Sequence, residues 1–388
     1  MRQYIDTNNN NYTTMRFTIS STTLSNKLNA LAKVINVKSP TPILADILFD
    51  IHDNTLFLTA SDSENTMVTS LPVGESDGSM TFAINCKNIL DAVKSFSEQP
   101  ITFELDTNSN IVNIMYLNGH FSMPTDDANT YPETDKINEG YTELTISSNL
   151  LAENINRSLF ATAQDELRPQ MNGIYFDLTP ECLAVVASDG HKLVRNKLFS
   201  VLCNEQRAFI LPKKPATLLK NMLDKDGGDV VIRFNERNAS ICFAENEVYC
   251  RLIEGRYPNY NSVIPTNNNN EITIDRESLL NAIKRVQPFA NDSSNLIKFN
   301  VDATTLTLDA ADFDFSKTAT EKVACQYNGQ PMNIGFKGVA FIEILSNFDC
   351  DEIIIKLADP SRAGLVVPAQ QPENQDVQML VMPMLIND

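Results

Sequence analysis

The sequence repeats itself three times, and this repeat limits the possible folds more than any other feature of the chain. Three eight-residue segments, 17–24, 144–151 and 272–279, share an alternating pattern of apolar and polar residues that ends in a leucine. Their central isoleucines stand at positions 19, 146 and 274. A second segment, which ends in an aspartate at 62, 189 and 312, recurs with nearly the same spacing. A constant internal period indicates that one structural unit occurs three times.

Each third of the chain also divides into two similar halves. Strand-like segments centred on an isoleucine recur along the chain at Ile19, Ile84, Ile146, Ile210, Ile274 and Ile334. Apolar residues at helical spacing, such as Leu24, Leu28 and Leu31, follow the strand, and further alternating strands come next. We therefore predict an α+β fold of three repeated domains, each made of two strand-helix-strands half-units. In each domain, a sheet layer carries two helices on one face.

The expected domain boundaries lie where the apolar periodicity fails. Residues 1–14 are polar and predict a disordered tail. The three domains are expected over residues 15–138, 141–265 and 270–388, and polar linkers rich in Pro, Gly and Asn separate them.

Composition narrows the classes of site that this chain can hold. Its seven cysteines form no CxxC pair, which is typical of scattered thiols in a reducing cytoplasm. Its three histidines are far apart in sequence, so we expect neither a metal site nor a cofactor. The chain has no run of 18 apolar residues and its N-terminal residues do not resemble a secretory signal, so we expect a cytoplasmic protein without a membrane span.

Positive charge is concentrated on the predicted helices, although the net charge of the chain is −18. The predicted helices carry twelve Lys and Arg and four Asp and Glu. Asp275 is not counted, because we expect it to be the N-cap of its helix. A positive face would attract phosphate backbones without reading the bases. Alternatively, these helix faces are simply exposed to solvent and contain Lys because it is a good helix former. The predicted helices span roughly residues 23–37, 86–96, 149–162, 213–223, 275–287 and 337–347.

Two further segments suggest a functional site. Ser188, Asp189 and His191 have the residue types of a hydrolase triad, but no GxSxG motif is present and the equivalent residues Asp62 and Asp312 have no nearby histidine. A tight turn at Asp189-Gly190 is the alternative. The C-terminal segment 379–386 is apolar, so it forms either a buried strand or part of a groove that binds varied ligands.

Segments 187–193, 252–260 with 263–265, 168–173 and 381–384 together resemble the bacterial DNA polymerase III beta subunit, the sliding clamp family, and the resemblance extends from Met15 to Ile386. It implies that two chains join head to tail into a closed ring, with helices lining a hole for double-stranded DNA of any sequence. Such a ring is a non-catalytic processivity factor that tethers the replicative polymerase. The clamp loader and repair proteins bind the same ring through short linear peptides.

The resemblance also implies two sets of site residues. Candidate DNA contacts are Lys38, Arg168, Lys213 and Lys214. A pocket for partner peptides, between the second and third domains, is expected to contain Met171, Ser188, Gly190, His191, Lys192, Leu193, Pro258, Val263, Leu380, Met382, Pro383 and Met384.

The chain departs from the family pattern around this pocket. Leu385, Asn261 and Ser262 stand where basic residues are common, and Asn387-Asp388 extend the C-terminus, so partner preference is expected to differ. A hydrolase that uses Ser188, Asp189 and His191 and a repetitive surface-binding protein are the alternative functions.

Overall fold

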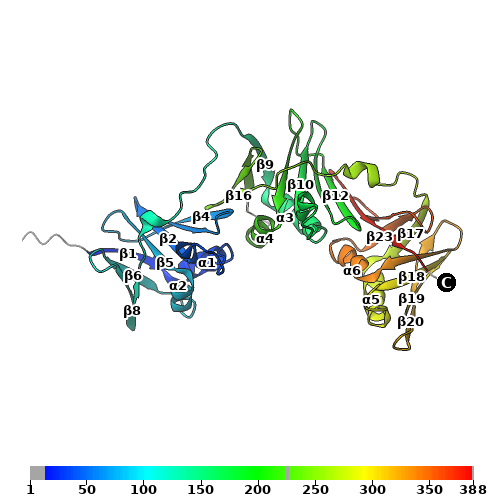
Figure 1. Ribbon diagram of the computed structural model, residues 1–388, viewed down its shortest axis with the longest axis horizontal. Coiled ribbons are helices and arrows are strands. Elements are labelled where there is room, and N and C mark those ends of the chain that lie inside the picture. The colour runs from blue at the N-terminus through cyan, green and yellow to red at the C-terminus, as the bar shows by residue number, and fades with distance from the viewer. Residues whose placement is uncertain (1–13, 224–226, 387–388) are drawn as a thin grey trace, which may run out of the picture. The chain divides into compact units, whose positions relative to one another are not determined.

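The computed structural model describes residues 14–223 and 227–386, and it contains the predicted half-unit six times (Figure 1). Each half-unit is a strand, an α-helix and three further strands, from β1-α1-β2-β3-β4 to β22-α6-β23-β24-β25. The six isoleucines that defined the period all lie in the first strand of a half-unit, and all are at least 96% buried. The predicted α+β repeat is confirmed.

The elements have the following bounds in the described residues. The helices are α1 (Ser21–Leu31), α2 (Cys86–Val93), α3 (Ser148–Leu159), α4 (Lys213–Met222), α5 (Arg276–Val286) and α6 (Gly338–Ser346). Strands of the first half of the chain are β1 (Thr14–Ser20), β2 (Asp46–His52), β3 (Thr55–Ser61), β4 (Asn65–Pro72), β5 (Met80–Asn85), β6 (Pro100–Asp106), β7 (Ile111–Tyr116), β8 (Gly119–Pro124), β9 (Thr142–Ser147), β10 (Gly173–Leu178), β11 (Leu183–Ser188) and β12 (Lys192–Leu198). The later strands are β13 (Arg207–Pro212), β14 (Asp229–Phe234), β15 (Asn238–Phe243), β16 (Asn246–Arg251), β17 (Asn270–Asp275), β18 (Leu296–Asp302), β19 (Thr305–Asp312), β20 (Lys317–Ala324), β21 (Gln326–Tyr327), β22 (Met332–Lys337), β23 (Glu352–Leu357), β24 (Gly364–Pro368), β25 (Gln375–Val381) and β26 (Pro383–Met384).

The last residue of the strand before each helix is also the helix N-cap. Side chains of Ser20, Asn85, Ser147 and Asp275 accept a hydrogen bond from a backbone N–H of the first helical turn, which confirms the predicted cap at Asp275. Strand and helix therefore meet without a linker. Some helices are shorter than the periodicity predicted. Helix α1 ends at Leu31 rather than near residue 37, because the N–H groups of Lys33 and Val34 bond three residues back, to Ala30 and Leu31, in tighter turns.

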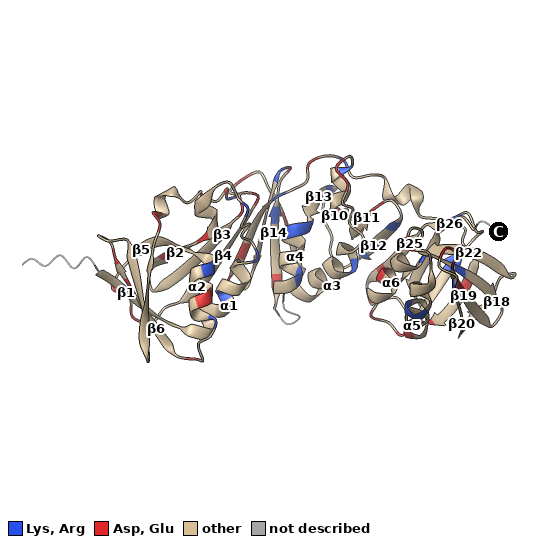
Figure 2. Cartoon of the chain, turned by 60° about the horizontal axis from the view of Figure 1, so that its bottom comes forward, with Lys and Arg blue, Asp and Glu red and all other residues tan. Residues whose placement is uncertain are grey.

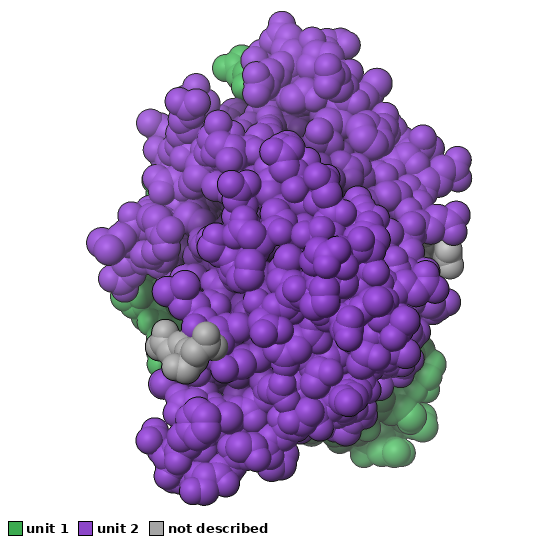
Figure 3. Space-filling model, turned by 90° about the vertical axis from the view of Figure 1, so that its right-hand side faces the viewer, with its two compact units in different colours: residues 1–143, 230–234, 238–251 green, residues 144–229, 235–237, 252–388 purple. Residues whose placement is uncertain are grey.

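The chain forms two compact units, coloured separately in Figure 3. The first comprises residues 1–143, 230–234 and 238–251 and holds the four-stranded sheet β1-β6-β7-β8. Its second sheet contains β5-β2-β3-β4-β16-β15-β14 in this order. Strands β14 to β16, expected in the second domain, belong to this unit because β16 continues the sheet alongside β4. Of the expected polar tail, only Thr14 lies within the described residues, and it begins β1.

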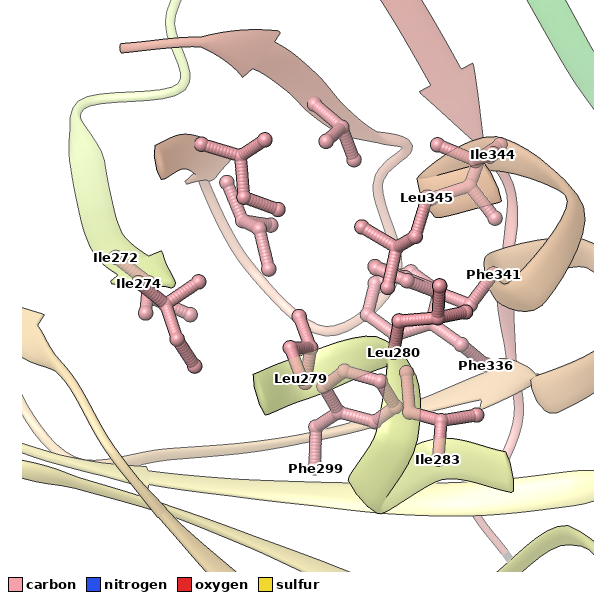
Figure 4. Close-up of a cluster of buried hydrophobic side chains, with 14 of the residues drawn as sticks. Ile272, Ile274, Leu279, Leu280, Ile283, Phe299, Phe336, Phe341, Ile344 and Leu345 are labelled. Carbon is pink, nitrogen blue, oxygen red and sulfur yellow. The ribbon is translucent and has the colours of Figure 1, made fainter. Parts of the chain in front are cut away.

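The second unit comprises residues 144–229, 235–237 and 252–388. One sheet has the order β13-β10-β11-β12-β25-β24-β23-β17-β21, and another has the order β20-β19-β18-β22-β26. Strand β12 pairs with β25, so residues of the expected second and third domains share one sheet. Buried side chains from α5, α6 and the surrounding strands form a hydrophobic core in this unit (Figure 4). In it, the rings of Phe299, Phe336 and Phe341 contact one another.

All seven cysteines are free thiols. Over residues 14–223 and 227–386, no group of three or more His, Cys, Asp or Glu side chains has an arrangement that could hold a metal ion. None of the described helices combines the length and the apolar character that a membrane crossing requires.

A buried carboxyl group, that of Asp46, lies in the first unit where β2 meets β5, next to the exposed Asp126. Asp46 is 3% exposed, and its Oδ2 atom has no hydrogen-bond partner among the described residues. The neighbouring Asp126 is held in place by two backbone hydrogen bonds with Ala83. Burial, followed by the proximity of the Asp126 carboxyl, raises the pKa of Asp46 from 3.8 to about 7.

This pair predicts that the free energy of unfolding falls between about pH 4 and pH 7, because the native state holds a proton that an ordinary Asp has already lost. The substitution Asp46→Asn should remove this dependence and make the protein more stable than the wild type at pH 8, by an amount on the order of a few kcal/mol. Urea unfolding at pH 5 to 8 measures the effect. Asp50→Asn, on an exposed position of the same strand, is the control, and equal pH profiles for wild type and Asp46→Asn would contradict the prediction.

Candidate functional site

The turn between β11 and β12 is the centre of the candidate peptide pocket. Asp189 Oδ1 accepts hydrogen bonds from the backbone N–H groups of His191 (2.8 Å) and Lys192 (2.9 Å). Ser188 Oγ accepts from the Gly190 N–H (3.1 Å) and donates to the Lys192 carbonyl (2.9 Å). Gly190 has a φ of +89°, which side-chain-bearing residues rarely adopt. These bonds fix the backbone and present the exposed His191 to solvent.

The same bonds exclude the hydrolase arrangement. The Ser188 hydroxyl and the Asp189 carboxylate are used by the turn, and no hydrogen bond joins either of them to the His191 imidazole in the described chain. A triad requires these contacts in series. The equivalent Asp62 and Asp312 also accept backbone N–H groups at the start of their turns. The repeated aspartate is therefore a turn-forming residue.

The C-terminal strand lies directly beside this turn. In the antiparallel pairing of β12 with β25, Leu193 is opposite Leu380, and the Met382 N–H donates to the His191 carbonyl at 2.9 Å. Leu193 and Leu380 are both 3% exposed and belong to one apolar cluster with Tyr257 and Tyr260. The structure therefore brings segments 188–193, 257–260 and 380–382 together.

Apolar side chains remain exposed around this cluster. Val263 is 56% exposed and Met382 is 42% exposed, and Pro258 is also exposed. In contrast, Met171 is buried, and Pro383 and Met384 are half-buried because they pair with β22 as β26. The two leucines are therefore the buried part of this apolar cluster, and Val263, Met382 and Pro258 are exposed apolar residues around it.

Lys192 acts as a link between two parts of the second unit. Its ammonium lies 2.7 Å from Asp189 Oδ2 and 3.1 Å from Glu343 Oε2 on α6, and it lies over the ring of Phe160. Burial opposes the charge of Asp189, but hydrogen bonds from the side chain and amide of Lys192 and from the amide of His191 outweigh it and lower the pKa of Asp189. Sequence reasoning missed Glu343 and Phe160, since no repeat or motif marks them.

Arg168 lies beside the same turn. A Cβ atom on Gly190 would lie 3.2 Å from Arg168 Nη1, and Arg168 Nε donates to Asp165 Oδ2 at 2.7 Å. Its guanidinium is therefore placed at the edge of the candidate peptide pocket. Lys38 is exposed in the first unit, just before the turn at Pro42–Ala45.

Lys213 and Lys214 occupy the first two positions of α4. Pro212 precedes them and provides no side-chain cap within the described residues. Two cations at a helix N-terminus oppose the helix dipole, so these lysines do not serve helix stability. They add to the positive potential of the uncapped N–H groups, and this combination favours the binding of phosphate.

Within their observed bounds, the helices carry nine Lys and Arg and four Asp and Glu (Figure 2). Their net charge is therefore +5, against −18 for the chain. The remaining residues carry −23, so the predicted separation of charge is present, although Lys33, Lys94 and Lys337 lie just outside the helices. Some helical cations form ion pairs, such as Arg285 with Glu321 of β20.

Family models account for almost the whole described chain. Those for the N-terminal, central and C-terminal domains of the DNA polymerase III beta subunit match residues 15–135, 145–259 and 261–385. The chain belongs to this family. Members of this sliding clamp family are non-catalytic processivity factors, which agrees with the absence of a triad at Ser188.

Known sliding clamps are similar over their full length. The beta sliding clamp of Pseudomonas aeruginosa is 24% identical over 95% of this chain and 100% of its own, and that of Bacillus subtilis is 25% identical over 95% and 99%. A crystal structure of the P. aeruginosa clamp with ligand has a TM-score of 0.89 at 24% identity, covering 96% of this chain and all of that one. The Thermotoga maritima beta subunit has a TM-score of 0.87 at 24% identity, with the same coverage.

The turn geometry of this clamp predicts a stability effect at Asp189. The substitution Asp189→Ala removes the acceptor of two backbone N–H groups and one partner of Lys192, so we expect a loss of about 2–4 kcal/mol in the free energy of unfolding. Because the pKa of Asp189 is lowered, the difference from wild type should be present at pH 7 and shrink as the pH falls below about 4. Urea unfolding measures both effects. The exposed pair of Asp359 and Arg362 provides the control, since Asp359→Ala should cost less than about 1 kcal/mol.

Proposed function

We propose that this protein is a DNA sliding clamp that encircles double-stranded DNA and tethers the replicative polymerase to its template. The observation that carries the proposal is the net charge of +5 on the helices of a chain whose remaining residues carry −23. A positive face directed at DNA attracts any phosphate backbone, and an acidic exterior limits other contacts with nucleic acid. The family of the chain supports the same function.

The charge pattern also fits a protein that must slide. Lys38, Arg168, Lys213 and Lys214 are the proposed phosphate contacts, and contacts with phosphate carry no sequence information. A few lysines give weak, salt-dependent attraction, so retention depends on the closed ring rather than on affinity. Holding the polymerase on the ring raises its effective concentration at the primer end.

We propose that the ring is a head-to-tail homodimer, in which the first domain of one chain joins the third domain of the other. Two open sheet edges support this arrangement. Strand β8 ends the sheet β1-β6-β7-β8, and β20 ends the sheet β20-β19-β18-β22-β26 in the described residues. An exposed edge strand presents unpaired backbone groups that a partner strand can satisfy. Pairing of β8 with β20 would close both edges in both chains.

The pocket at the β11–β12 turn is proposed to bind short linear peptides of the polymerase, the clamp loader and repair proteins. An apolar floor of Leu193 and Leu380, with Val263, Met382 and Pro258 accessible around it, fits peptides with a few hydrophobic anchors. His191 and Arg168 supply polar groups beside it. Leu385 is 86% exposed in place of a basic residue, so acidic peptide residues should contribute less to binding at this edge.

Retention on DNA distinguishes a ring from an ordinary DNA-binding protein. After loading by its clamp loader onto nicked circular DNA, the protein should remain bound during gel filtration in 0.5 M salt. Linearisation of the same DNA should release it, because a ring slides off free ends. Equal loss from circular and linear DNA, or a monomer at the concentrations used, would contradict the proposal.

The pocket is tested by substitutions at its exposed apolar residues. The double substitution Val263→Ser and Met382→Ser should reduce polymerase stimulation at least tenfold while leaving the dimer and its retention on circular DNA unchanged. Leu167→Ser, at a residue that is 92% exposed, is the matched control. Unchanged stimulation would rule out this pocket as the docking site.

A further inference from the structure

We propose that Phe313 and Phe315, at the turn between β19 and β20, form an aromatic clasp that packs against the first domain of a second copy of this chain. The inference rests on the proposed head-to-tail dimer and adds a contact beyond the pairing of strand edges. These two phenylalanines define the clasp.

The clasp residues are held apart from the core of their own unit. Phe313 is 87% exposed and Phe315 is 68% exposed, whereas phenylalanine is commonly among the most buried residues. The turn that carries them is ordered by local hydrogen bonds. The 2%-exposed Asp312 accepts from the Asp314 N–H at 3.2 Å, and the Ser316 N–H donates to the Phe313 carbonyl at 3.3 Å. A fixed turn that exposes two aromatic rings has little conformational entropy to lose when it binds.

Exposed apolar residues lie near both open edges. Fifteen large hydrophobic residues are exposed in the described chain, and six of them lie at these edges. Phe313, Phe315 and Phe289 are on the β20 side, where the helical turn Gln287–Phe289 contacts β19 and β20. Ile111, Met115 and Leu117 are on the β8 side, in β7 and the turn that follows it. Apolar residues therefore accompany both edges that the proposed dimer would bury.

Strand direction indicates which parts would meet. The strands next to both edges pair antiparallel with their neighbours, and we expect the same direction between β8 and β20. The start of β20, directly after the clasp, would then lie opposite the end of β8 at Pro124. The partner of Pro124 in β7 is Ile111, which is 38% exposed. The clasp would thus cover Ile111 and Pro124 of the second copy.

Charge does not oppose this contact. The Lys317 ammonium lies 5.2 Å from the centre of the Phe315 ring, so a cation accompanies the aromatic residues. Across the β7–β8 pairing, Ile111 and Pro124 lie opposite each other, so neither has a charged partner there. The β6 partner of Ile111 is Asp106, which β7 and β8 would separate from Lys317 of the second copy.

Dimer dissociation tests the clasp in the full-length protein. The double substitution Phe313→Ser and Phe315→Ser should raise the dimer dissociation constant about ten- to a hundred-fold, measured by subunit exchange between fluorescently labelled chains. Phe199→Ser, at a 46%-exposed phenylalanine of the loop after β12, is the matched control and should leave the constant unchanged. Thermal unfolding at high protein concentration, where the dimer persists, should be alike in both variants.

A photo-crosslinking amino acid at position 313 tests the geometry directly. Crosslinks should map to residues 107–127 of the other chain and should disappear at concentrations where the dimer dissociates. Unchanged dissociation of the double variant, or crosslinks that map elsewhere, would overturn the clasp while leaving the ring intact. Reduced polymerase stimulation with normal dissociation would assign the turn to a partner protein and would also overturn it. A wild-type monomer would instead contradict the ring itself.

Discussion

The antiparallel pairing of β12 with β25 is the interaction on which the candidate peptide pocket depends. It places Leu193 opposite Leu380. Just beyond the paired strands, the Met382 N–H donates a hydrogen bond to the His191 carbonyl. Because side chains alternate across a strand, a slip of one residue would turn both leucines away from Tyr257 and Tyr260. Neither strand forms the floor of the pocket alone. Residues almost 190 positions apart become one surface only because two of the repeated half-units share a sheet.

Sequence reasoning predicted the repeated part of the fold well, because the repeat is local information. Six buried isoleucines and the cap at Asp275 follow from strand alternation and capping chemistry within a few residues. The ends of helices were less accurate. Ile35 continues the apolar spacing beyond Leu31, but the backbone tightens into three-residue turns at Lys33 and Val34. The grouping of β14 to β16 with the first unit depends on long-range pairing of β16 with β4, and no local pattern encodes it.

The candidate site was predicted less evenly. The turn at Asp189-Gly190 follows from turn chemistry, and the structure shows why it is not a catalytic triad. The position of Arg168 beside Gly190 and the link from Lys192 to Glu343 arise from tertiary packing between segments far apart in sequence. Resemblance assigned Arg168 to DNA, which stays a prediction, and the structure adds that its guanidinium lies beside Gly190. Motif residues identify a family, but their neighbours determine what each side chain contacts.

The two lysines that begin α4 have a consequence for attempts to stabilise this protein. Rules that improve helices replace cations in the first turn with Asp or Glu and add a capping Ser, Thr or Asp before it. At this helix those rules would strengthen the fold and reverse the sign of the potential at its N-terminus. With Lys213 and Lys214 as the proposed phosphate contacts, a thermostable variant selected without DNA would bind the nucleic acid backbone more weakly. Any selection for stability at Lys213 and Lys214 needs DNA retention as a second criterion.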